Sequence, residues 1–297
     1  MPPANLATPA TPIVYLDGRF LPLDQARVSV LDRGFLFGDG VYEVVPAYGG
    51  HLFRLTEHLN RLENSLSEIR CTNPLGREQW SLLLSDLVAR NGNGDLSLYL
   101  QVTRGVGPNR DHAFPMGVPP SIFAMATPLL PLPADKRQNG VSAILAEDIR
   151  WGRCNIKTIT LLANVLLRQQ AIDAGAFEAI LVRGAQVTEG AASNVFIVHD
   201  SALITPPKGP LLLPGITRDL VLELAAADGI PAREDTLVVE DLRRADEVWI
   251  TSATREVVAI VTIDGTPVGT GHPGPLYRRM MELYQAFKEQ ARKGNYE

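Results

Sequence analysis

The sequence predicts an α+β (mixed α/β) fold with two domains. Its 297 residues exceed the roughly 150 that are typical of one domain. Short apolar segments of strand length are separated by turn residues, and isolated amphipathic helices lie between them. This succession favours hairpin-rich sheets over a doubly wound parallel sheet, in which strands and helices alternate regularly. A proline-rich run over residues 128–133 divides the chain into two parts.

The first part predicts two hairpins, two helices and two further strands. The turn pairs Asp17-Gly18 and Gly49-Gly50 each separate two apolar runs and tolerate the positive φ angles of tight hairpins. A second helix is expected over 77–90, and strands over 96–103 and 121–127. The first helix is predicted where apolar residues recur every three or four positions, as on one buried helix face: Leu55, Leu59, Leu62, Leu66 and Ile69.

The second part begins after Pro128–Pro133, which we interpret as a linker because proline lacks an amide donor and restrains the preceding residue. The predicted domain plan is a mobile N-terminal tail over 1–12, a small N-terminal α/β domain over 13–127, the linker over 128–133 and a larger C-terminal domain over 134–297. The predicted elements of the last domain are strands near 141–146 and 150–156, a helix over 160–174, a hairpin of 177–183 and 186–190, strands over 193–198 and 202–205, a helix from 216 to 228, strands over 247–251 and 257–263, and a final helix from about residue 275.

Composition excludes several classes of protein. Apolar residues make up 45% and charged residues 21%, as in ordinary globular chains, and the net charge of −5 argues against nucleic acid as a partner. The two cysteines, Cys71 and Cys154, form no metal-binding or disulfide pattern. The first twelve residues lack the features of a signal peptide, and no run approaches the ~18 apolar residues of a membrane span. We expect a cytoplasmic protein that binds no metal and does not associate with a membrane.

The segment Asp148–Thr158 contains a candidate nucleophile. It alternates apolar and polar residues like a strand, carries Arg150 and Arg153, and ends at Lys157 just before a helix with apolar residues. Apolar structure and neighbouring cations disfavour the ammonium form of a lysine, and the neutral amine is the form that makes a Schiff base. Taken alone, the pattern fits an exposed lysine more often.

Two further segments indicate anion binding. In Val187–Phe196, Glu189 and small residues lie between two strands, where a carboxylate could hold a ring nitrogen protonated and backbone amides could approach a phosphate. In Leu213–Asp219, a Pro-Gly turn opens a helix, whose first amides form a natural anion site. Alone, each also fits an ordinary hairpin or helix start, which are the commoner structures.

These segments, together with Asp32–Val45 (DRGFLFGDGVYEVV), closely resemble the class IV (fold type IV) pyridoxal-phosphate-dependent aminotransferases, and among them the bacterial D-amino acid (D-alanine) aminotransferases. The motifs occur in the family's order from about Ile13 to the last helix. The resemblance implies the fold type IV architecture, with a small N-terminal α/β domain and a larger C-terminal cofactor-binding domain that has a mixed sheet or barrel-like core.

The resemblance also implies pyridoxal 5′-phosphate as the cofactor. Lys157 matches the lysine that forms the internal aldimine and then moves the proton between the substrate Cα and the cofactor C4′. Glu189 matches the acid that pairs with the pyridinium nitrogen. Arg61 matches a phosphate-binding arginine, although its spacing also fits a surface ion pair with Glu57. The other implied cofactor contacts are Ser193, Ile216, Thr217 and Ser252.

Substrate binding is implied for three more residues. Tyr42 matches a tyrosine near the substrate carboxylate, and strand alternation places it on the opposite face from Val41 and Glu43. Arg110 and His112 match an Arg-x-His pair that the D-specific branch contributes from the neighbouring subunit, which implies a homodimer with active sites near the subunit interface. Arginine suits this task because its planar fork holds both oxygens of a carboxylate.

The implied reaction is a ping-pong transamination between a D-amino acid, such as D-alanine, and a 2-oxo acid, such as 2-oxoglutarate. The alternatives are an (R)-selective amine aminotransferase, an aminodeoxychorismate lyase-like enzyme and a branched-chain L-amino acid aminotransferase. The sequence departs from the family where Ala191, Ala192 and Ala253 replace expected hydroxyl residues. The Arg104–Arg110 loop is also one residue longer than the pattern.

Overall fold

The computed structural model describes residues 11–295, so most of the tail predicted for 1–12 lies outside the described residues. The chain forms two compact units. Unit 1 comprises the chain up to Leu129 together with Lys157–Thr160 and Arg292–Gly294, and unit 2 comprises the remainder. The predicted domain boundaries stay predictions. Each unit is described by itself below.

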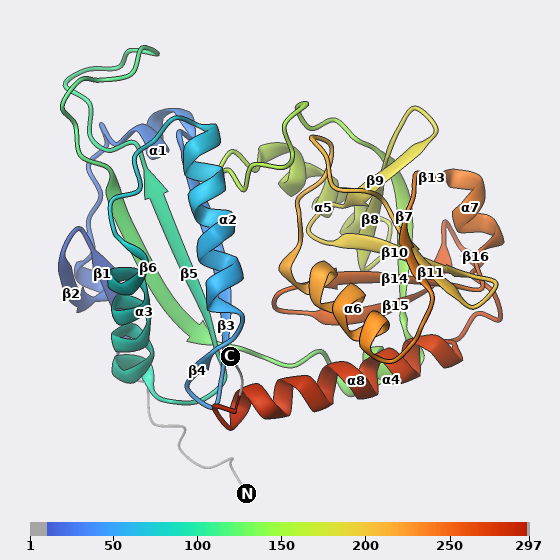
Figure 1. Cartoon of the computed structure of the whole chain (residues 1–297). Helices are drawn as coiled ribbons and strands as arrows, with labels where there is room; N and C mark the ends of the chain where they lie inside the picture. Colours follow the sequence, from blue (N-terminus) through green and yellow to red (C-terminus); the bar gives the residue numbers. More distant parts are fainter. Residues whose placement is uncertain (1–10, 296–297) are drawn as a thin grey trace, which may run out of the picture. The chain divides into compact units, whose positions relative to one another are not determined.

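Unit 1 is built on a six-stranded antiparallel sheet with the order β2-β1-β6-β5-β3-β4 (Figure 1). Both predicted hairpins are present, closed at Asp17-Gly18 and Gly49-Gly50. The elements are β1 (Ile13–Leu16), β2 (Arg19–Pro22), a 3₁₀ turn (Leu23–Gln25), α1 (Arg33–Phe37), β3 (Gly40–Tyr48), β4 (His51–Leu52), α2 (Leu55–Glu68), α3 (Arg77–Asn91), β5 (Leu96–Thr103) and β6 (Ser121–Pro128).

The core of unit 1 follows from the two periodicities in its sequence. Along β5, the buried residues Leu96, Leu98 and Leu100 alternate with half-buried residues, so one face of the strand carries the apolar side chains. Helices α2 and α3 cover the sheet with their apolar faces. Their buried apolar residues are Leu59, Leu62 and Leu66 of α2, and Trp80, Leu83, Leu84, Leu87 and Val88 of α3.

Unit 2 contains a ten-stranded mixed sheet, as the predicted fold class requires. Its hydrogen-bonded path runs β12-β11-β10-β14-β15-β7-β8-β9-β13, and β16 pairs with β15. The pairs β11–β12, β15–β7 and β7–β8 are parallel, and the others are antiparallel. The elements are α4 (Ala134–Asn139), β7 (Val141–Glu147), α5 (Leu162–Asp173), β8 (Glu178–Arg183), β9 (Gln186–Gly190), β10 (Asn194–His199), β11 (Ala202–Thr205), α6 (Ile216–Ala227), β12 (Ala232–Glu234), β13 (Leu237–Val238), α7 (Val239–Arg244), β14 (Glu247–Ser252), β15 (Glu256–Ile263), β16 (Thr266–Pro267) and α8 (Pro275–Arg292).

A buried carboxylate fixes the long helix α8 to the sheet of unit 2. Glu247 begins β14, and its two oxygens accept hydrogen bonds from the backbone amides of Leu276 (2.9 Å) and Tyr277 (2.8 Å). The indole of Trp249 donates to the same carboxylate at 2.9 Å. Helix N-termini leave amides without an intrahelical acceptor and favour negative charge, so Glu247 caps α8 from a distant strand.

The prediction of a strand near 150–156 is wrong. Over these residues the chain forms bends and turns. The side chain of Asp148 accepts a hydrogen bond from the backbone amide of Arg150 (3.1 Å), which is the local pairing of an Asx turn. Apolar and polar residues therefore alternate here without a strand. The predicted helices and the other strands are present, but α1, α4, α7 and the short strands β12, β13 and β16 were not predicted.

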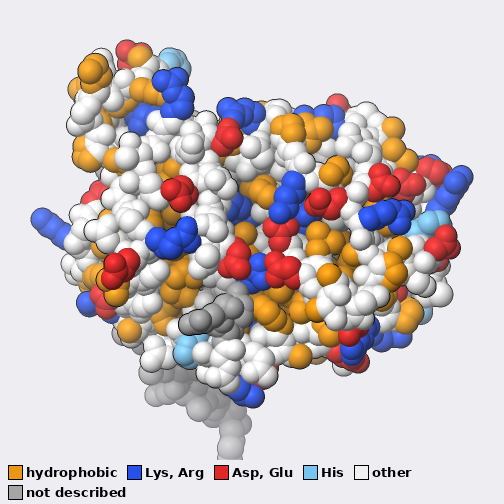
Figure 2. Space-filling view, viewed as in Figure 1, with side chains coloured by type: hydrophobic (Ala, Val, Ile, Leu, Met, Phe, Trp, Pro, Cys, Tyr) orange, Lys and Arg blue, Asp and Glu red, His pale blue; other side chains and the backbone are white. Residues whose placement is uncertain are grey.

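The surface shows no segregation of charge on the face seen in Figure 2, where acidic and basic side chains are interspersed. None of the helices within residues 11–295 is both long and apolar enough to cross a bilayer.

A pair of glycines in unit 2 tests how tightly the backbone is packed. Gly265 (φ 76°) and Gly269 (φ 52°) are both left-handed, but a Cβ on Gly265 would meet no atom within 4 Å, whereas one on Gly269 would lie 2.2 Å from the Asp246 carbonyl oxygen. Gly265→Ala should cost about 1 kcal/mol for its φ angle alone. Gly269→Ala should cost at least about 3 kcal/mol, because backbone must also move. Urea unfolding followed by circular dichroism measures both, and equal losses would contradict the expectation.

Candidate active site

Lys157 is held by the edge of strand β3. The amide of Tyr42 donates to the Lys157 carbonyl (2.9 Å), and the amide of Ile159 donates to the Gly40 carbonyl (3.1 Å). Val41 and Thr158 form an antiparallel bridge between these bonds. The Lys157 amide donates to Oγ of Ser65 on α2 at 3.2 Å. These backbone bonds therefore fix the position from which the lysine side chain projects.

The side chain of Lys157 lies on an aromatic surface. Its Nζ is 4.3 Å from the ring centroid of Tyr42, within cation–π range. Tyr42 stacks on Tyr99 with 5.6 Å between centroids, and Tyr99 lies 6.4 Å from Phe123. Burial, together with the neighbouring Tyr42, raises the pKa of Tyr99 to about 12. The structure thus brings together Lys157 and Tyr42, two of the predicted site residues.

Arg61 is buried and faces the sheet of unit 1. Its Nε and one terminal nitrogen each donate to the carboxylate of Glu43 at 2.8 Å, a bidentate pair. The alternative that paired it with Glu57 is wrong, because Glu57 pairs with Arg54 at 3.1 Å. Glu43 thus fixes the plane of the Arg61 guanidinium. The phosphate-binding role of Arg61 stays a prediction.

His58 completes this buried cluster. Its Nδ1 lies 2.8 Å from Oε2 of Glu43. Burial opposes the ionisation of Glu43, but the charge of Arg61 and the hydrogen bonds from Arg61 and His58 outweigh it and hold the pKa of this carboxyl well below its usual range. Burial lowers the pKa of His58, against the opposing effect of Glu43. Neutral His58 therefore donates from Nδ1 to an ionised Glu43.

In unit 2, Glu189 is a buried carboxylate at the end of β9. It accepts hydrogen bonds from the side-chain amide of Asn194 (3.2 Å) and from the Leu213 amide (3.0 Å), and it forms an ion pair with Arg150. Arg150 is itself held by two bonds to Asp148, at 2.9 and 3.0 Å. These bonds stabilise the negative charge of Glu189 in a buried position.

The electrostatics of this second cluster favour the charged forms of Asp148 and Arg150. Burial opposes the charge on Asp148, but hydrogen bonds and the charge of Arg150 outweigh it and lower the pKa of the carboxyl. Burial likewise opposes the charge on Arg150, but Asp148 and Glu189 raise its pKa. The arginine is therefore permanently charged, and one guanidinium links two acids.

The start of α6 lies beside this cluster. Ile216 and Thr217 are the first two residues of the helix and are buried. Their amides have no carbonyl one turn earlier to bond. Gly215 caps the helix, and a Cβ there would lie 1.9 Å from Oδ1 of Asn194. Only glycine fits this approach, and it brings the helix start to the residue that contacts Glu189.

The two predicted serines lie at strand ends in unit 2, Ser193 just before β10 and Ser252 at the end of β14. Ser193 is buried, and its Oγ donates to Oε2 of Glu178 at 3.2 Å. Arg255 also reaches Glu178, at 3.3 Å. Ser252 ends β14 opposite Glu256. Contact of either serine with a phosphate stays a prediction.

Arg110 and His112 are exposed in a loop between β5 and β6. Both side chains contact Phe37 of α1. The Arg110 guanidinium carbon is 5.2 Å from the centroid of the Phe37 ring, and the His112 ring centroid is also 5.2 Å from it. The pair is therefore gathered around one aromatic ring.

The predicted residues divide between the units. Unit 1 contains Tyr42, Arg61, Arg110, His112 and Lys157, and unit 2 contains Glu189, Ser193, Ile216, Thr217 and Ser252. The partners that hold them were not predicted from the sequence: Glu43 and His58 for Arg61, and Asp148 and Arg150 for Glu189. One signal was available, namely a charged residue, Glu43, within the apolar run of β3.

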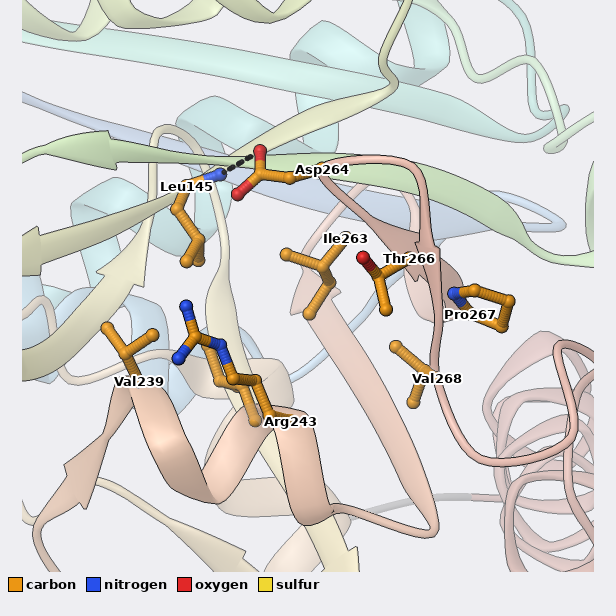
Figure 3. Close-up of a pocket in the computed structure, with 9 residues that line it drawn as sticks. Leu145, Val239, Arg243, Ile263, Asp264, Thr266, Pro267 and Val268 are labelled. Atoms are coloured by element: carbon orange, nitrogen blue, oxygen red, sulfur yellow. Dashed lines mark hydrogen bonds between the residues drawn. The ribbon is translucent and has the colours of Figure 1, made fainter.

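A pocket of about 220 Å³ in unit 2 contains none of these residues (Figure 3). Its walls are mostly apolar, and Asp264 accepts a hydrogen bond from the Leu145 amide at one side (3.1 Å). The lining residues are Leu145, Val239, Leu242, Arg243, Ile263, Asp264, Thr266, Pro267 and Val268. The pocket is therefore distinct from the candidate site.

The lowered pKa of His58 predicts a pH-dependent stability. Unfolding restores its ordinary pKa of about 6.5, so the unfolded chain binds a proton that the fold rejects, and stability falls below that pH by up to about 1.4 kcal/mol per unit. His58→Asn keeps a side-chain N–H for Glu43 but does not titrate, so its melting temperature should fall less between about pH 7.5 and 5.5. Exposed His199→Asn is the control and should follow the wild type. Identical slopes for wild type and His58→Asn would contradict this.

Comparisons with known proteins identify the family of this chain. A model of the family "Amino-transferase class IV" matches residues 40–263. A D-alanine aminotransferase of Bacillus licheniformis is 43% identical over 92% of this chain and 95% of its own length. A D-alanine aminotransferase of Staphylococcus haemolyticus is 42% identical over 93% of this chain and 98% of its own length.

Solved structures give the same result for the fold. The branched-chain amino acid aminotransferase of Escherichia coli superposes with a TM-score of 0.87 at 27% identity, covering 93% of this chain and 94% of that one. A second branched-chain amino acid aminotransferase, solved with pyridoxamine 5′-phosphate, also has a TM-score of 0.87 at 27% identity and covers 94% of each chain. The fold type IV prediction is thereby confirmed, and the chain belongs to the class IV aminotransferase family.

Proposed function

We propose that this protein is a pyridoxal-phosphate-dependent D-amino acid aminotransferase, which transfers the amino group of a D-amino acid such as D-alanine to a 2-oxo acid such as 2-oxoglutarate. The observation that carries the proposal is the placement of Lys157. Its backbone is pinned to the edge of β3, and its amine lies 4.3 Å from the centre of the Tyr42 ring. A nucleophilic amine needs such a fixed, partly desolvated position.

The donor set of unit 2 fits the cofactor. Glu189 offers a buried anionic oxygen for a protonated ring nitrogen, and Arg150 and Asn194 hold it in place. The buried N-terminus of α6, at Ile216 and Thr217, offers amides to a phosphate. In unit 1, the resemblance to the family assigns a phosphate contact to Arg61, whose guanidinium is oriented by Glu43. These are the complementary charges that an aromatic cation and a phosphate require.

When bound, the cofactor supplies an electron sink for the charge that develops at the substrate Cα. The protein supplies proton transfer and orientation. Nζ of Lys157 takes the proton from the substrate Cα and delivers it to C4′ of the cofactor. Only the neutral amine can accept the proton. Glu189 stays ionised and keeps the ring nitrogen protonated. Because donor and acceptor use the same groups in turn, we expect ping-pong kinetics.

The choice of a D-amino acid rests on Arg110 and His112. Their loop places a cation and an imidazole around Phe37, a combination suited to binding a carboxylate. The relatives named D-alanine aminotransferase are the more similar in sequence. The branched-chain alternative is favoured by the solved structures of the same fold, so L-leucine is the decisive competing donor.

A donor panel tests the assignment. The purified enzyme, incubated with cofactor and 2-oxoglutarate, should use D-alanine in preference to L-leucine and to an (R)-arylamine, with 2-oxo acid formation as the readout. Lys157→Ala should lower the rate by about 10³-fold or more, because the proton-transfer group is lost. Borohydride should fix the cofactor to the wild-type chain but not to this variant.

Lys208→Ala serves as the matched control, because Lys208 is an exposed lysine paired with Asp219 at 2.7 Å. It should retain wild-type activity. Activity on L-leucine alone would overturn the D-amino acid assignment. Full activity of Lys157→Ala would overturn the role of that lysine.

A homodimer is part of the proposal, supported by an apolar surface on α5. Leu167 and Ala171 of this helix are buried, but an opposite face exposes apolar side chains. A contiguous exposed apolar patch is typical of a protein interface. Its members, Leu162, Val165, Leu166 and Ile172, are between 50% and 70% exposed.

Light scattering with size exclusion tests the dimer. The wild type should have the mass of two chains. Leu166→Glu should shift it toward one chain, because a buried charge at an interface lacks compensation. Leu130→Glu is the control, since Leu130 is 79% exposed and does not belong to α5. A monomeric wild type, or a dimer unaffected by Leu166→Glu, would contradict this interface.

A cytoplasmic location is also proposed. Cys71 and Cys154 are both free and buried, and free thiols suit a reducing compartment.

A further inference from the structure

A buried arginine anchors the exposed loop that carries Arg110 and His112. Arg33, the first residue of α1, is only 4% exposed. Its guanidinium donates to three consecutive carbonyls of the loop: Asp111 (2.6 Å), His112 (3.2 Å) and Ala113 (3.2 Å). Asp111, His112 and Ala113 are themselves exposed. Arg33 thus fixes the backbone on both sides of His112.

The orientation of the Arg33 guanidinium is fixed by the carboxylate of Asp39. Its Nε donates to Oδ2 of Asp39 at 2.8 Å, and Arg104 binds both oxygens of the same carboxylate at 2.8 and 2.9 Å. The two guanidinium groups lower the pKa of Asp39, although its burial opposes this effect. Arg104 begins the loop, so one carboxylate ties the loop base to the residue that holds the loop tip.

Phe37 gives the side chains of the loop their orientation. It lies four residues after Arg33, on the same side of the single turn of α1. The Arg33 guanidinium carbon is 4.8 Å from its ring centroid, and Arg110 and His112 approach the same ring at 5.2 Å each. Arg33 therefore fixes the loop backbone, while Phe37 contacts the two side chains that carry the chemistry.

The turn that presents α1 cannot shift easily. Asp32 caps the helix by accepting from the Gly34 amide (2.8 Å), and Thr103 donates to its other oxygen (2.9 Å). A Cβ on Gly34 would lie 2.4 Å from the Thr103 methyl group. Helix α1, which carries Arg33 and Phe37, is therefore held in a fixed position against the sheet, because Thr103 is the last residue of β5.

We propose that Arg33 and Phe37 are positioning residues for the Arg110–His112 pair, and that their contacts determine how tightly this enzyme binds the carboxylate of its substrate. The inference rests on the proposed function, in which that pair holds the carboxylate. Neither positioning residue needs to touch the substrate. Their effect acts through the geometry of the loop.

Two substitutions test the proposal. Arg33→Lys keeps a charge for Asp39, but its ammonium has three N–H donors and cannot serve that carboxylate and all three carbonyls at once. Phe37→Leu keeps an apolar side chain but removes the ring. Each should raise the KM for D-alanine about ten-fold and change kcat less than about two-fold, because binding rather than proton transfer is weakened. Hydrogen exchange of the peptide over 106–116 should become faster in Arg33→Lys.

Arg27→Lys is the matched control, because Arg27 also donates to two backbone carbonyls, at 2.6 and 2.9 Å, but lies outside the loop. It should change neither KM nor loop exchange. Arg110→Ala separates the two hypotheses. If it leaves the KM for D-alanine unchanged, the proposed carboxylate site is wrong. If it raises KM while Arg33→Lys and Phe37→Leu do not, or if these two lower kcat alone, the positioning role is overturned.

Discussion

The open edge of strand β3 is the feature on which the candidate site depends. Strand β4 pairs with β3 only at Ala47 and Tyr48, so the first residues of β3 offer unpaired backbone groups on that side. The segment from Lys157 to Ile159 takes these groups. An exposed strand edge normally invites further pairing. Here it fixes one position along the chain for Lys157. Gly40 permits close packing on both sides of β3, because a Cβ there would lie 2.6 Å from the Val102 carbonyl oxygen of β5 and 3.0 Å from Cδ1 of Ile159.

Strand alternation then separates two kinds of environment across β3. Tyr42 faces Lys157, and Glu43 on the opposite face is buried with Arg61 and His58. A buried carboxylate is tolerated only when it is paired, so Glu43 holds its two partners in fixed positions. Unit 2 repeats this solution with Asp148, Arg150 and Glu189. In each cluster a buried arginine binds a carboxylate, and each charge is stabilised by its neighbour before any ligand is present.

The sequence predicted what periodicity and turn chemistry determine. The leucine spacing of α2 and the Asp17-Gly18 turn each specify one local conformation, and the structure confirms both. The 150–156 strand failed because a side chain, Asp148, competed locally for the backbone. The buried ion pairs were out of reach for a different reason. Arg33 meets carbonyls 78 to 80 residues away, and Glu43 meets Arg61 18 residues away. Such partners are brought together when helices and loops pack on the sheet, and no local pattern of the sequence contains that packing.

The residues expected to perform the reaction and those expected to select the substrate lie on different kinds of structure in this chain. The groups expected to move protons and hold the cofactor lie on a strand edge, at the end of a strand and at a buried helix start, where packing fixes them. The pair expected to bind the substrate carboxylate lies on an exposed loop. Loops vary more readily than the elements they connect, so relatives named for D-alanine and for branched-chain substrates can share one fold. A loop that selects a substrate must nevertheless be rigid, because a mobile cation loses binding energy to ordering. The buried fork of Arg33 supplies that rigidity while the side chains of Arg110 and His112 remain exposed.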